Sequence, residues 1–255
     1  MKVSGSRNRM KRFINRLIPA RLALPIRYLK LKLSGQLDEE IVAIKHAMRS
    51  RRRAIDVGTN IGIYTYALSK YCCKVESFEP VTECTKMLHE YANYQGNIAI
   101  HNVALSNRSE EAFLFIPFMR DKPELNVGLA SINDPGGQRV RLPVLLRRLD
   151  DYEFIDVDFI KIDVEGHELE VIEGALETIR REKPVLLVEI EQRHLIGRTI
   201  AQVFDYILAL GYQGSFLQGG HRKSIDTFSY EQHQMPYLEN VFSKRYINNF
   251  FFFPR

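Results

Sequence analysis

From residue 54 onward, the chain alternates short apolar runs with segments of helical periodicity. The runs read as strands are RAIDVG, KVESFEP, DFIKIDV and PVLLVEIE, and the helical segments are GIYTYALSKYC, HELEVIEGALETIRRE and TIAQVFDYILALG. Repeated alternation of this kind predicts a parallel sheet with helices on both faces. The run PVLLVEI is apolar nearly throughout, as a strand covered on both faces should be. The sequence therefore predicts a doubly wound α/β domain.

Further elements are predicted around this core. Residues 36–50 read as a helix, and IAIHNVAL, EAFLFIP, RVRLPVLL, YQGSFLQ and NNFFFFP read as strands. Thr82 is predicted to cap a helix that Gly96 ends. A long loop rich in turn formers holds Asn126, Gly128 and Ser131, and loops of that length are often lids or binding segments. These three residues could close over a ligand, or the loop could be a surface insertion.

Positive charge is concentrated in the first 53 residues, which hold 15 Lys or Arg against 3 Asp or Glu, whereas the rest holds 21 against 28. Apolar side chains interleave with these cations over residues 1–35. This mixture is typical of an amphipathic helix that covers the domain, or of one that docks on an anionic membrane surface or acidic partner. Nucleic acid is not expected, because the basic excess stops before the α/β part. We divide the chain into a basic amphipathic N-terminal arm and helix (1–53) and an α/β domain (54–255).

The cysteines and the hydropathy bear on location. Cys72, Cys73 and Cys84 are odd in number and two are adjacent, which makes a poor disulfide framework, so free thiols are expected. No run of about 18 apolar residues predicts a spanning helix. The basic N-terminus lacks the apolar core and cleavage site of a secretory signal. We expect a cytoplasmic protein, with peripheral membrane contact through the arm left open.

The segment AIDVGTNIGIYT marks the first predicted ligand site. In an open α/β sheet, ligands bind beyond the carboxyl ends of the strands, and Gly58 and Gly62 let the backbone turn sharply there. A nicotinamide dinucleotide site requires G-x-G-x-x-G, but Asn60 interrupts this pattern and no third glycine follows. A phosphate-binding loop is excluded because no Gly-Lys-Ser/Thr follows. Asp56 would repel a pyrophosphate and attract the ammonium of S-adenosylmethionine.

A second acidic residue supports an adenosine cofactor. Glu79 ends the second predicted strand, 23 residues beyond Asp56, where it can accept both ribose hydroxyls. Nicotinamide enzymes and methyltransferases share this feature, so Asp56 and the missing glycine decide between them. They favour the sulfonium cofactor, with a nicotinamide oxidoreductase kept as the alternative.

The ordered motifs together resemble the FkbM family of S-adenosylmethionine-dependent methyltransferases over residues 54–254. They are IDVGTNIGIYT, ESFEP, HNVALSN, GLASI, DFIKIDVEGHELEVIEGA, PVLLVEIE and NNFFFFP. The resemblance implies a Rossmann-like sheet of seven strands whose last strand is antiparallel. The residues it implies around the methionine part of the cofactor are Asp56, Gly58, Asn60 and Gly62. Those it implies around the adenosine are Glu79 at the ribose and Asn102, Val103 and Ala104 along the adenine edge.

The resemblance also implies O-methylation of a hydroxyl, often on a sugar, a glycan or a glycosylated natural product. Such a hydroxyl is weakly acidic and needs a general base or a metal that lowers its pKa. The segment KIDVEGHE carries Asp163, Glu165 and His167 to the end of a strand, and the next strand brings Glu189 to the same edge. We expect the catalytic groups among these four. Asp163, Glu165 and Glu189 could instead hold a divalent cation such as Mg²⁺.

Neighbouring polar residues have other interpretations. Lys161 is expected to make a structural pairing and not to take part in the chemistry, while Glu191 and His194 are compatible with the protein surface. A third functional class also stands beside the methyltransferase and the oxidoreductase. It is a non-catalytic module that binds the cofactor and docks through its basic arm.

Overall fold

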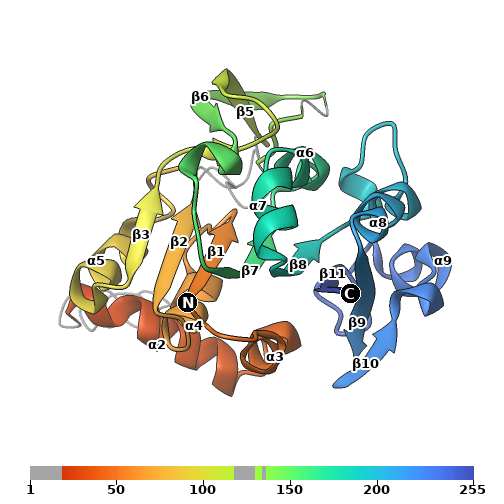
Figure 1. Ribbon diagram of the computed structural model, residues 1–255, viewed down its shortest axis with the longest axis horizontal. Helices are drawn as coiled ribbons and strands as arrows, with labels where there is room; N and C mark the ends of the chain where they lie inside the picture. The colour runs from red at the N-terminus through yellow and green to blue at the C-terminus, as the bar shows by residue number, and fades with distance from the viewer. Residues whose placement is uncertain (1–18, 118–129, 134–135) are drawn as a thin grey trace, which may run out of the picture.

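The computed structural model describes residues 19–117, 130–133 and 136–255. Its centre is an eight-stranded sheet with the order β10-β9-β11-β8-β7-β1-β2-β3 (Figure 1). The strands are β1 (Arg53–Val57), β2 (Lys74–Phe78), β3 (Ile98–His101), β7 (Val157–Ile162), β8 (Val185–Glu189), β9 (Tyr212–Gln218), β10 (His221–Ser224) and β11 (Asn249–Pro254).

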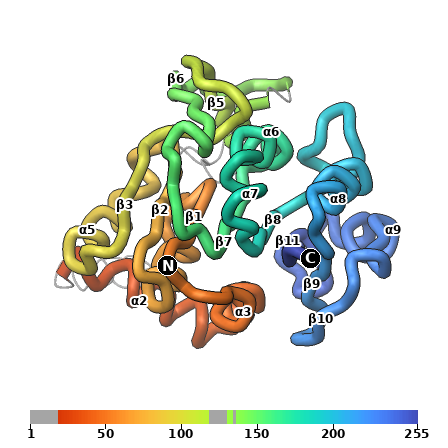
Figure 2. The backbone as a smooth tube through the Cα atoms, in the orientation of Figure 1, coloured from red at the N-terminus to blue at the C-terminus, as the bar shows by residue number. Residues whose placement is uncertain are grey.

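The strand directions confirm the predicted fold class. Strands β1, β2, β3, β7 and β8 are parallel, and the last strand, β11, runs antiparallel to both β8 and β9. Figure 2 shows this C-terminal strand beside β9 rather than at an outer edge of the sheet. The sheet has one strand more than the seven expected. The extra strand β10 follows a two-residue turn in which Gly219 and Gly220 have φ of 60° and 80°, the geometry of a tight hairpin.

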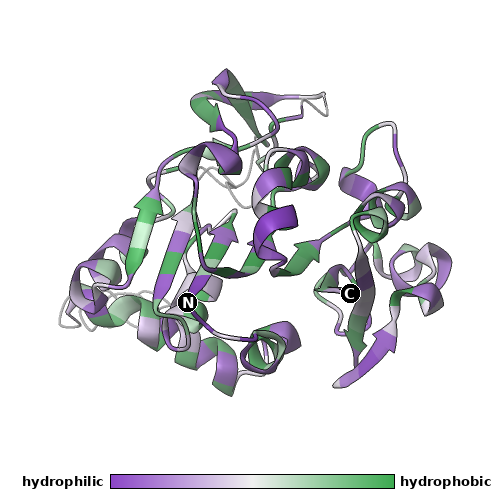
Figure 3. Cartoon of the chain, viewed as in Figure 1, coloured by the Kyte–Doolittle hydropathy of each residue, from purple (hydrophilic) through white to green (hydrophobic). Residues whose placement is uncertain are grey.

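Helices cover both faces of the sheet. They are α2 (Ala20–Leu33), α3 (Glu39–Ala47), α4 (Ile63–Ser69), α5 (Lys86–Gln95), α6 (Glu168–Glu173), α7 (Leu176–Glu182), α8 (Ile200–Ala209) and α9 (Tyr230–His233). Adjacent strand residues face opposite layers, as the pleat requires. Ile160 packs in the core beneath α6, α7 and α8, whereas Phe159 packs in the core beneath α3 and α4. Figure 3 shows apolar residues along strands such as β3 and β8, and polar residues along the outer strand β10.

A second, smaller sheet differs from the expected arrangement. The run IAIHNVAL does not form one strand but divides into β3 and β4 (Ala104–Leu105). Strand β4 joins β5 (Glu110–Pro117) and β6 (Arg139–Arg147) in the order β4-β6-β5. The last two strands were predicted, but their separate sheet was not. Figure 1 shows it standing at the edge toward which β1, β2 and β3 point.

Two helix boundaries also differ from expectation. The segment after the Asp163 strand forms α6 and α7 rather than one helix, and the break falls at Gly174. A Cβ there would lie 1.9 Å from the carbonyl oxygen of Ser106, so the close approach to the segment after β4 requires glycine. Thr82 lies in a turn, and α5 begins at Lys86. Gly96 ends α5 with φ of 74°, as predicted.

The described part of the basic arm is a helix packed on the domain. Leu24 of α2 is fully buried against Leu88 and Tyr91 of α5. Helix α2 thus covers α4 and α5, in agreement with the interpretation of the arm as an amphipathic helix that covers the domain.

Candidate cofactor and active site

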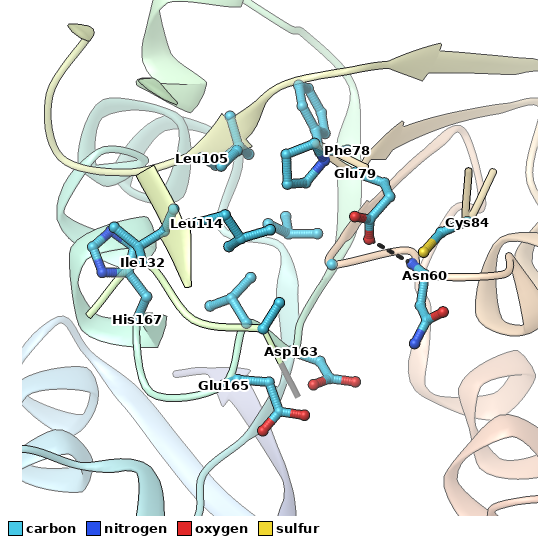
Figure 4. Close-up of a pocket in the computed structure, with 16 residues that line it drawn as sticks. Asn60, Phe78, Glu79, Cys84, Leu105, Leu114, Ile132, Asp163, Glu165 and His167 are labelled. Carbon is cyan, nitrogen blue, oxygen red and sulfur yellow. Dashed lines mark hydrogen bonds between the residues drawn. The ribbon is translucent and has the colours of Figure 1, made fainter. Parts of the chain in front are cut away.

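A pocket lies where the carboxyl ends of β1, β2 and β7 meet the three-stranded sheet (Figure 4). Its polar side chains are Asn60, Glu79, Cys84, Asp163, Glu165 and His167. Figure 4 shows Glu79 and Asn60 on one side, Asp163 and Glu165 together, and His167 at the opposite end beside Ile132. A cavity therefore lies at the glycine turn and the strand ends, where the sequence led us to expect a ligand site.

The β1–α4 turn brings the backbone close to β7. Gly58 has φ of 76°, and a Cβ on it would lie 1.7 Å from the carbonyl oxygen of Asp163. Asn60 and Gly62 also have positive φ, at 50° and 90°. Glycine or asparagine is favoured in this left-handed region because neither a branched nor a bulky side chain fits it. The turn therefore exposes backbone to the pocket at the tip of β1.

Glu79 is held by the same turn. Its Oε2 accepts a hydrogen bond from the backbone N–H of Asn60 at 2.9 Å, and its Oε1 accepts one from Val81 at 3.0 Å. Burial raises its pKa, and these two N–H groups oppose that shift. Each carboxylate oxygen keeps a free lone pair. The side chain is thus rigidly placed and can still accept the two hydroxyls of a ribose.

Asp56 lies behind the turn instead of in the pocket wall. Its carboxylate is fully buried, and the hydroxyl of Thr65 donates to Oδ2 at 2.6 Å. Oδ1 has no hydrogen-bond partner within the described residues. Burial raises the pKa of Asp56, and Lys161 opposes this shift. A direct contact with the cofactor's ammonium stays a prediction, for which Oδ1 is the available atom.

Lys161 is the buried cation of the site. Its Nζ lies 2.7 Å from Oδ2 of Asp163 and 4.6 Å from the ring centre of Tyr64. Lys161 is also the register partner of Asp56 across β7 and β1. Burial alone would lower the pKa of Lys161, but Asp163 and Asp56 raise it above its ordinary value. The predicted structural pairing is confirmed.

Glu165 occupies a tight turn after β7. Glu165 has φ of 54°. The turn is stabilised by a hydrogen bond from the N–H of Gly166 to Oε1 of Glu168 at 2.9 Å. Oε2 of Glu165 lies 2.9 Å from Nδ1 of His194. Burial raises the pKa of Glu165. Burial would lower the pKa of His194, but the adjacent Glu165 carboxylate raises it overall. Glu165 and His194 thus form a carboxylate–imidazole pair at the pocket.

His167 lies at the far end of the pocket, away from Asp163 and Glu165 (Figure 4). Only 2% of its surface is exposed. Its Nε2 hydrogen-bonds the Ser106 hydroxyl at 2.9 Å, and its Nδ1 lies 3.6 Å from Oε2 of Glu170. Burial lowers the pKa of His167. The imidazole therefore lines the pocket but contacts Ser106 and Glu170 and not Asp163 or Glu165.

Glu189 requires a correction. It ends β8 but does not line the pocket, and its Oε1 accepts a hydrogen bond from Asn248 at 2.8 Å. Burial and the nearby Asp163 raise the pKa of Glu189 well above its ordinary value. A second expectation also differs from the structure. Glu191, for which the sequence allowed a place on the surface, is only 4% exposed.

The expected metal ligands do not converge. Asp163 is paired with Lys161, while Glu165 is paired with His194. Across the parts of the chain that the structure describes, no group of three His, Cys, Asp or Glu side chains is arranged to hold a metal ion. Asp163, Glu165 and Glu189 therefore do not form the ligand set that the sequence allowed.

The three residues expected at the adenine edge lie in different surroundings. Ala104 lines the pocket, whereas the side-chain amide of Asn102 donates to the carbonyl of Glu79 at 3.3 Å, and Val103 packs on the core.

Of the three loop residues that could close over a ligand, only Ser131 lies among the residues that the structure describes. The Ser131 hydroxyl donates to the Glu165 carbonyl at 3.0 Å, whereas residues 126 and 128 lie outside the described residues.

A comparison with known protein families identifies the family to which this chain belongs. The methyltransferase FkbM domain matches residues 56–213, which is more than half of the chain. The chain belongs to the FkbM methyltransferase family. The match spans the glycine turn, Glu79 and the Asp163–Glu165 segment described above. No curated protein matches the chain.

A comparison with solved structures finds one that shares the fold of this chain and others that are more distant. A methyltransferase FkbM from Methylobacillus flagellatus KT is 19% identical with a TM-score of 0.51, over 93% of this chain and 59% of that one. This chain thus spans only part of the length of that protein. Precorrin-6y C5,15-methyltransferase from Geobacter metallireducens GS-15 is 10% identical with a TM-score of 0.46, over 85% and 87%. SMU.1697c from Streptococcus mutans, solved with SAH, is 10% identical with a TM-score of 0.44, over 88% and 97%.

Several pocket residues of this FkbM domain were missed by sequence reasoning. Phe78, Pro80 and Cys84 flank or follow Glu79, so their nearness to that acid was a usable signal. Leu114 and Ile132 reach the pocket from β5 and from the segment that bridges to it. No local pattern marks these two, because their position depends on how the small sheet docks.

Proposed function

We propose that the protein transfers a methyl group from S-adenosylmethionine to a hydroxyl of a sugar, a glycan or a glycosylated natural product. The observation that carries the proposal is the Glu79 carboxylate, fixed by the N–H of Asn60 in a pocket of an FkbM domain. The cofactor supplies a methyl group already activated on a sulfonium.

The lining of the pocket suits the cofactor's parts. Glu79 offers acceptors for the ribose hydroxyls, and Leu105 and Leu114 offer an apolar surface for the adenine. The Gly58 turn leaves room for backbone contact with the methionine part. Asp163 places negative charge beside the same turn, which favours a cationic ligand over a diphosphate.

Glu165 is the residue we assign as general base. It lines the pocket next to Asp163, and His194 holds one of its oxygens at 2.9 Å. Glu165 would take the proton that the acceptor hydroxyl loses as its oxygen receives the methyl group, whose bond to sulfur breaks. Burial raises the pKa of Glu165, which makes its carboxylate a stronger base once ionised. His194 holds the carboxylate in one orientation.

A methyl-transfer screen tests the proposal directly. The purified protein would be incubated with cofactor labelled in its methyl group and with free sugars, glycans and small glycosides, with and without EDTA. We expect label on a hydroxyl of at least one carbohydrate class. Label only on nitrogen or carboxylate acceptors would overturn the assigned substrate class.

The variant Glu165→Gln separates binding from chemistry. Loss of a general base lowers turnover by roughly 10²- to 10⁴-fold, while calorimetry with S-adenosylhomocysteine should show nearly unchanged affinity. Glu177→Gln, at a side chain that is 72% exposed on α7, is the matched control. Unchanged turnover in Glu165→Gln would remove Glu165 from the mechanism.

The two other functional classes make opposite predictions. A nicotinamide oxidoreductase would bind NADH and ignore S-adenosylhomocysteine. A non-catalytic module would bind S-adenosylhomocysteine yet methylate no acceptor. The family match and the G-x-N-x-G turn favour the methyltransferase.

A further inference from the structure

The outer face of α2 carries an exposed apolar stripe. Leu22, Leu29 and Leu33 are 43%, 51% and 78% exposed. Their spacing of seven and four residues places them on one side of the helix. The opposite side holds Leu24, which is fully buried against α5. The domain therefore uses one face of α2 and leaves the leucine face without a partner among the described residues.

Arg21, Lys30 and Lys32 flank this stripe, and Arg27 lies farther round the helix. Arg21, Arg27, Lys30 and Lys32 lie on α2, and residues 19–37 contain no Asp or Glu. None of the four forms a salt bridge with any residue that the structure describes. Arg21 lies over the ring of Tyr94, which is itself 65% exposed. The face therefore combines exposed leucines with uncompensated positive charge.

We propose that this face of α2 docks on an anionic lipid surface. A helix of this kind lies in the plane of the interface, with its apolar side chains among the acyl chains and its cations at the headgroups. A symmetric contact with a second copy would set these cations against each other. Nucleic acid would neutralise the cations but leave the leucines in water.

The helix is built to lie on a bilayer and not to cross it. It has 14 residues with Pro25 among them. No helix in the described parts of the chain is both long and apolar enough to span a membrane. Figure 1 shows α2 at the side of the molecule opposite the β4-β6-β5 sheet that borders the pocket. Docking therefore leaves the pocket accessible, and soluble acceptors should be methylated equally well without lipid.

Vesicle flotation of the full-length protein tests the proposal. We expect binding to vesicles of phosphatidylcholine mixed with phosphatidylglycerol and little binding to phosphatidylcholine alone, with added salt weakening the former. Lys30→Gln combined with Lys32→Gln should weaken partitioning by roughly thirtyfold, at about fivefold per cation. Leu29→Gln combined with Leu33→Gln should weaken it by about tenfold or more.

Matched controls keep the test specific. Arg180→Gln removes an exposed cation on α7, and Val42→Gln removes a side chain that is 56% exposed on α3; both should bind vesicles normally. All variants should retain the S-adenosylhomocysteine affinity and unfolding midpoint of the unaltered protein, so a failed methyltransferase assignment would not affect this result. Equal binding to neutral vesicles, binding unaffected by the α2 variants, or a dimer that those variants dissociate would overturn the proposal.

Discussion

Nζ of Lys161 lies 2.7 Å from Oδ2 of Asp163, and the lysine side chain is only 3% exposed. The pair joins the middle of the sheet to the tip of β7, where Asp163 meets the pocket. Asp56, in register with Lys161 on β1, adds a second buried carboxylate to the same cation. One lysine thus faces two buried carboxylates beside the cofactor turn.

Lys161→Met should destabilise the protein by about 3 kcal/mol, because it leaves buried carboxylates without their cation. Urea unfolding would measure the loss. Adding Asp163→Asn should restore part of it, since the second change removes an uncompensated charge. Lys86→Met, at an exposed site on α5, is the control. If the two effects were strictly additive, the ion pair would not be the cause.

Gly58→Ala should abolish cofactor binding and lower stability by well over 2 kcal/mol. Its Cβ would lie 1.7 Å from a backbone oxygen, in addition to the strain of φ at 76°. Gly96→Ala provides the matched control, because Gly96 has φ of 74° and nothing lies within 4 Å of an added Cβ. Thermal unfolding should show a cost of about 1–2 kcal/mol for that control. Similar losses in the two variants would mean that the backbone contact matters little.

Glu79→Gln should weaken S-adenosylhomocysteine binding by roughly ten- to a hundredfold. The amide cannot accept from both Asn60 and Val81 and also serve two ribose hydroxyls, and hydrogen bonds to a charged group contribute about 1.5–3 kcal/mol. Calorimetry would measure the affinity. Glu90→Gln, exposed on α5, should bind normally. Wild-type affinity in the Glu79 variant would place the ribose elsewhere.

Glu191 should contribute stability that is lost in acid. Its burial would raise its pKa, but Arg193, Tyr246 and Asn248 lower it from 4.5 to about 2. A lowered pKa means that the contribution is complete above pH 4.5 and disappears as the pH falls toward 2.

The test compares the unfolding free energy of the unaltered protein with that of Glu191→Gln between neutral and acid pH. We expect the difference to be constant near neutrality and to shrink below pH 4.5. Glu239→Gln, at an exposed site, should show no such change. A difference that grew on acidification would contradict the assigned direction.

Local sequence signals were enough for much of the site. Gly58, Asn60, Glu79, Asp163 and Glu165 all reach the pocket that the turn and strand ends predicted. Each sits at or just beyond a strand end, and parallel strands bring their carboxyl ends to one edge. The same rule misplaced Glu189, which ends β8 but does not line the pocket and instead accepts a hydrogen bond from Asn248.

The sequence by itself determined the strand–helix alternation, the acid after β2 and the turns with positive φ, because periodicity and backbone strain are properties of neighbouring residues. Only the tertiary structure decided that Lys161 faces Asp56 across β7 and β1, that His194 lies beside Glu165, and that the small sheet completes the pocket. These relations join segments far apart in the chain. They arise from packing and from the need of buried charges for partners, which no local pattern records.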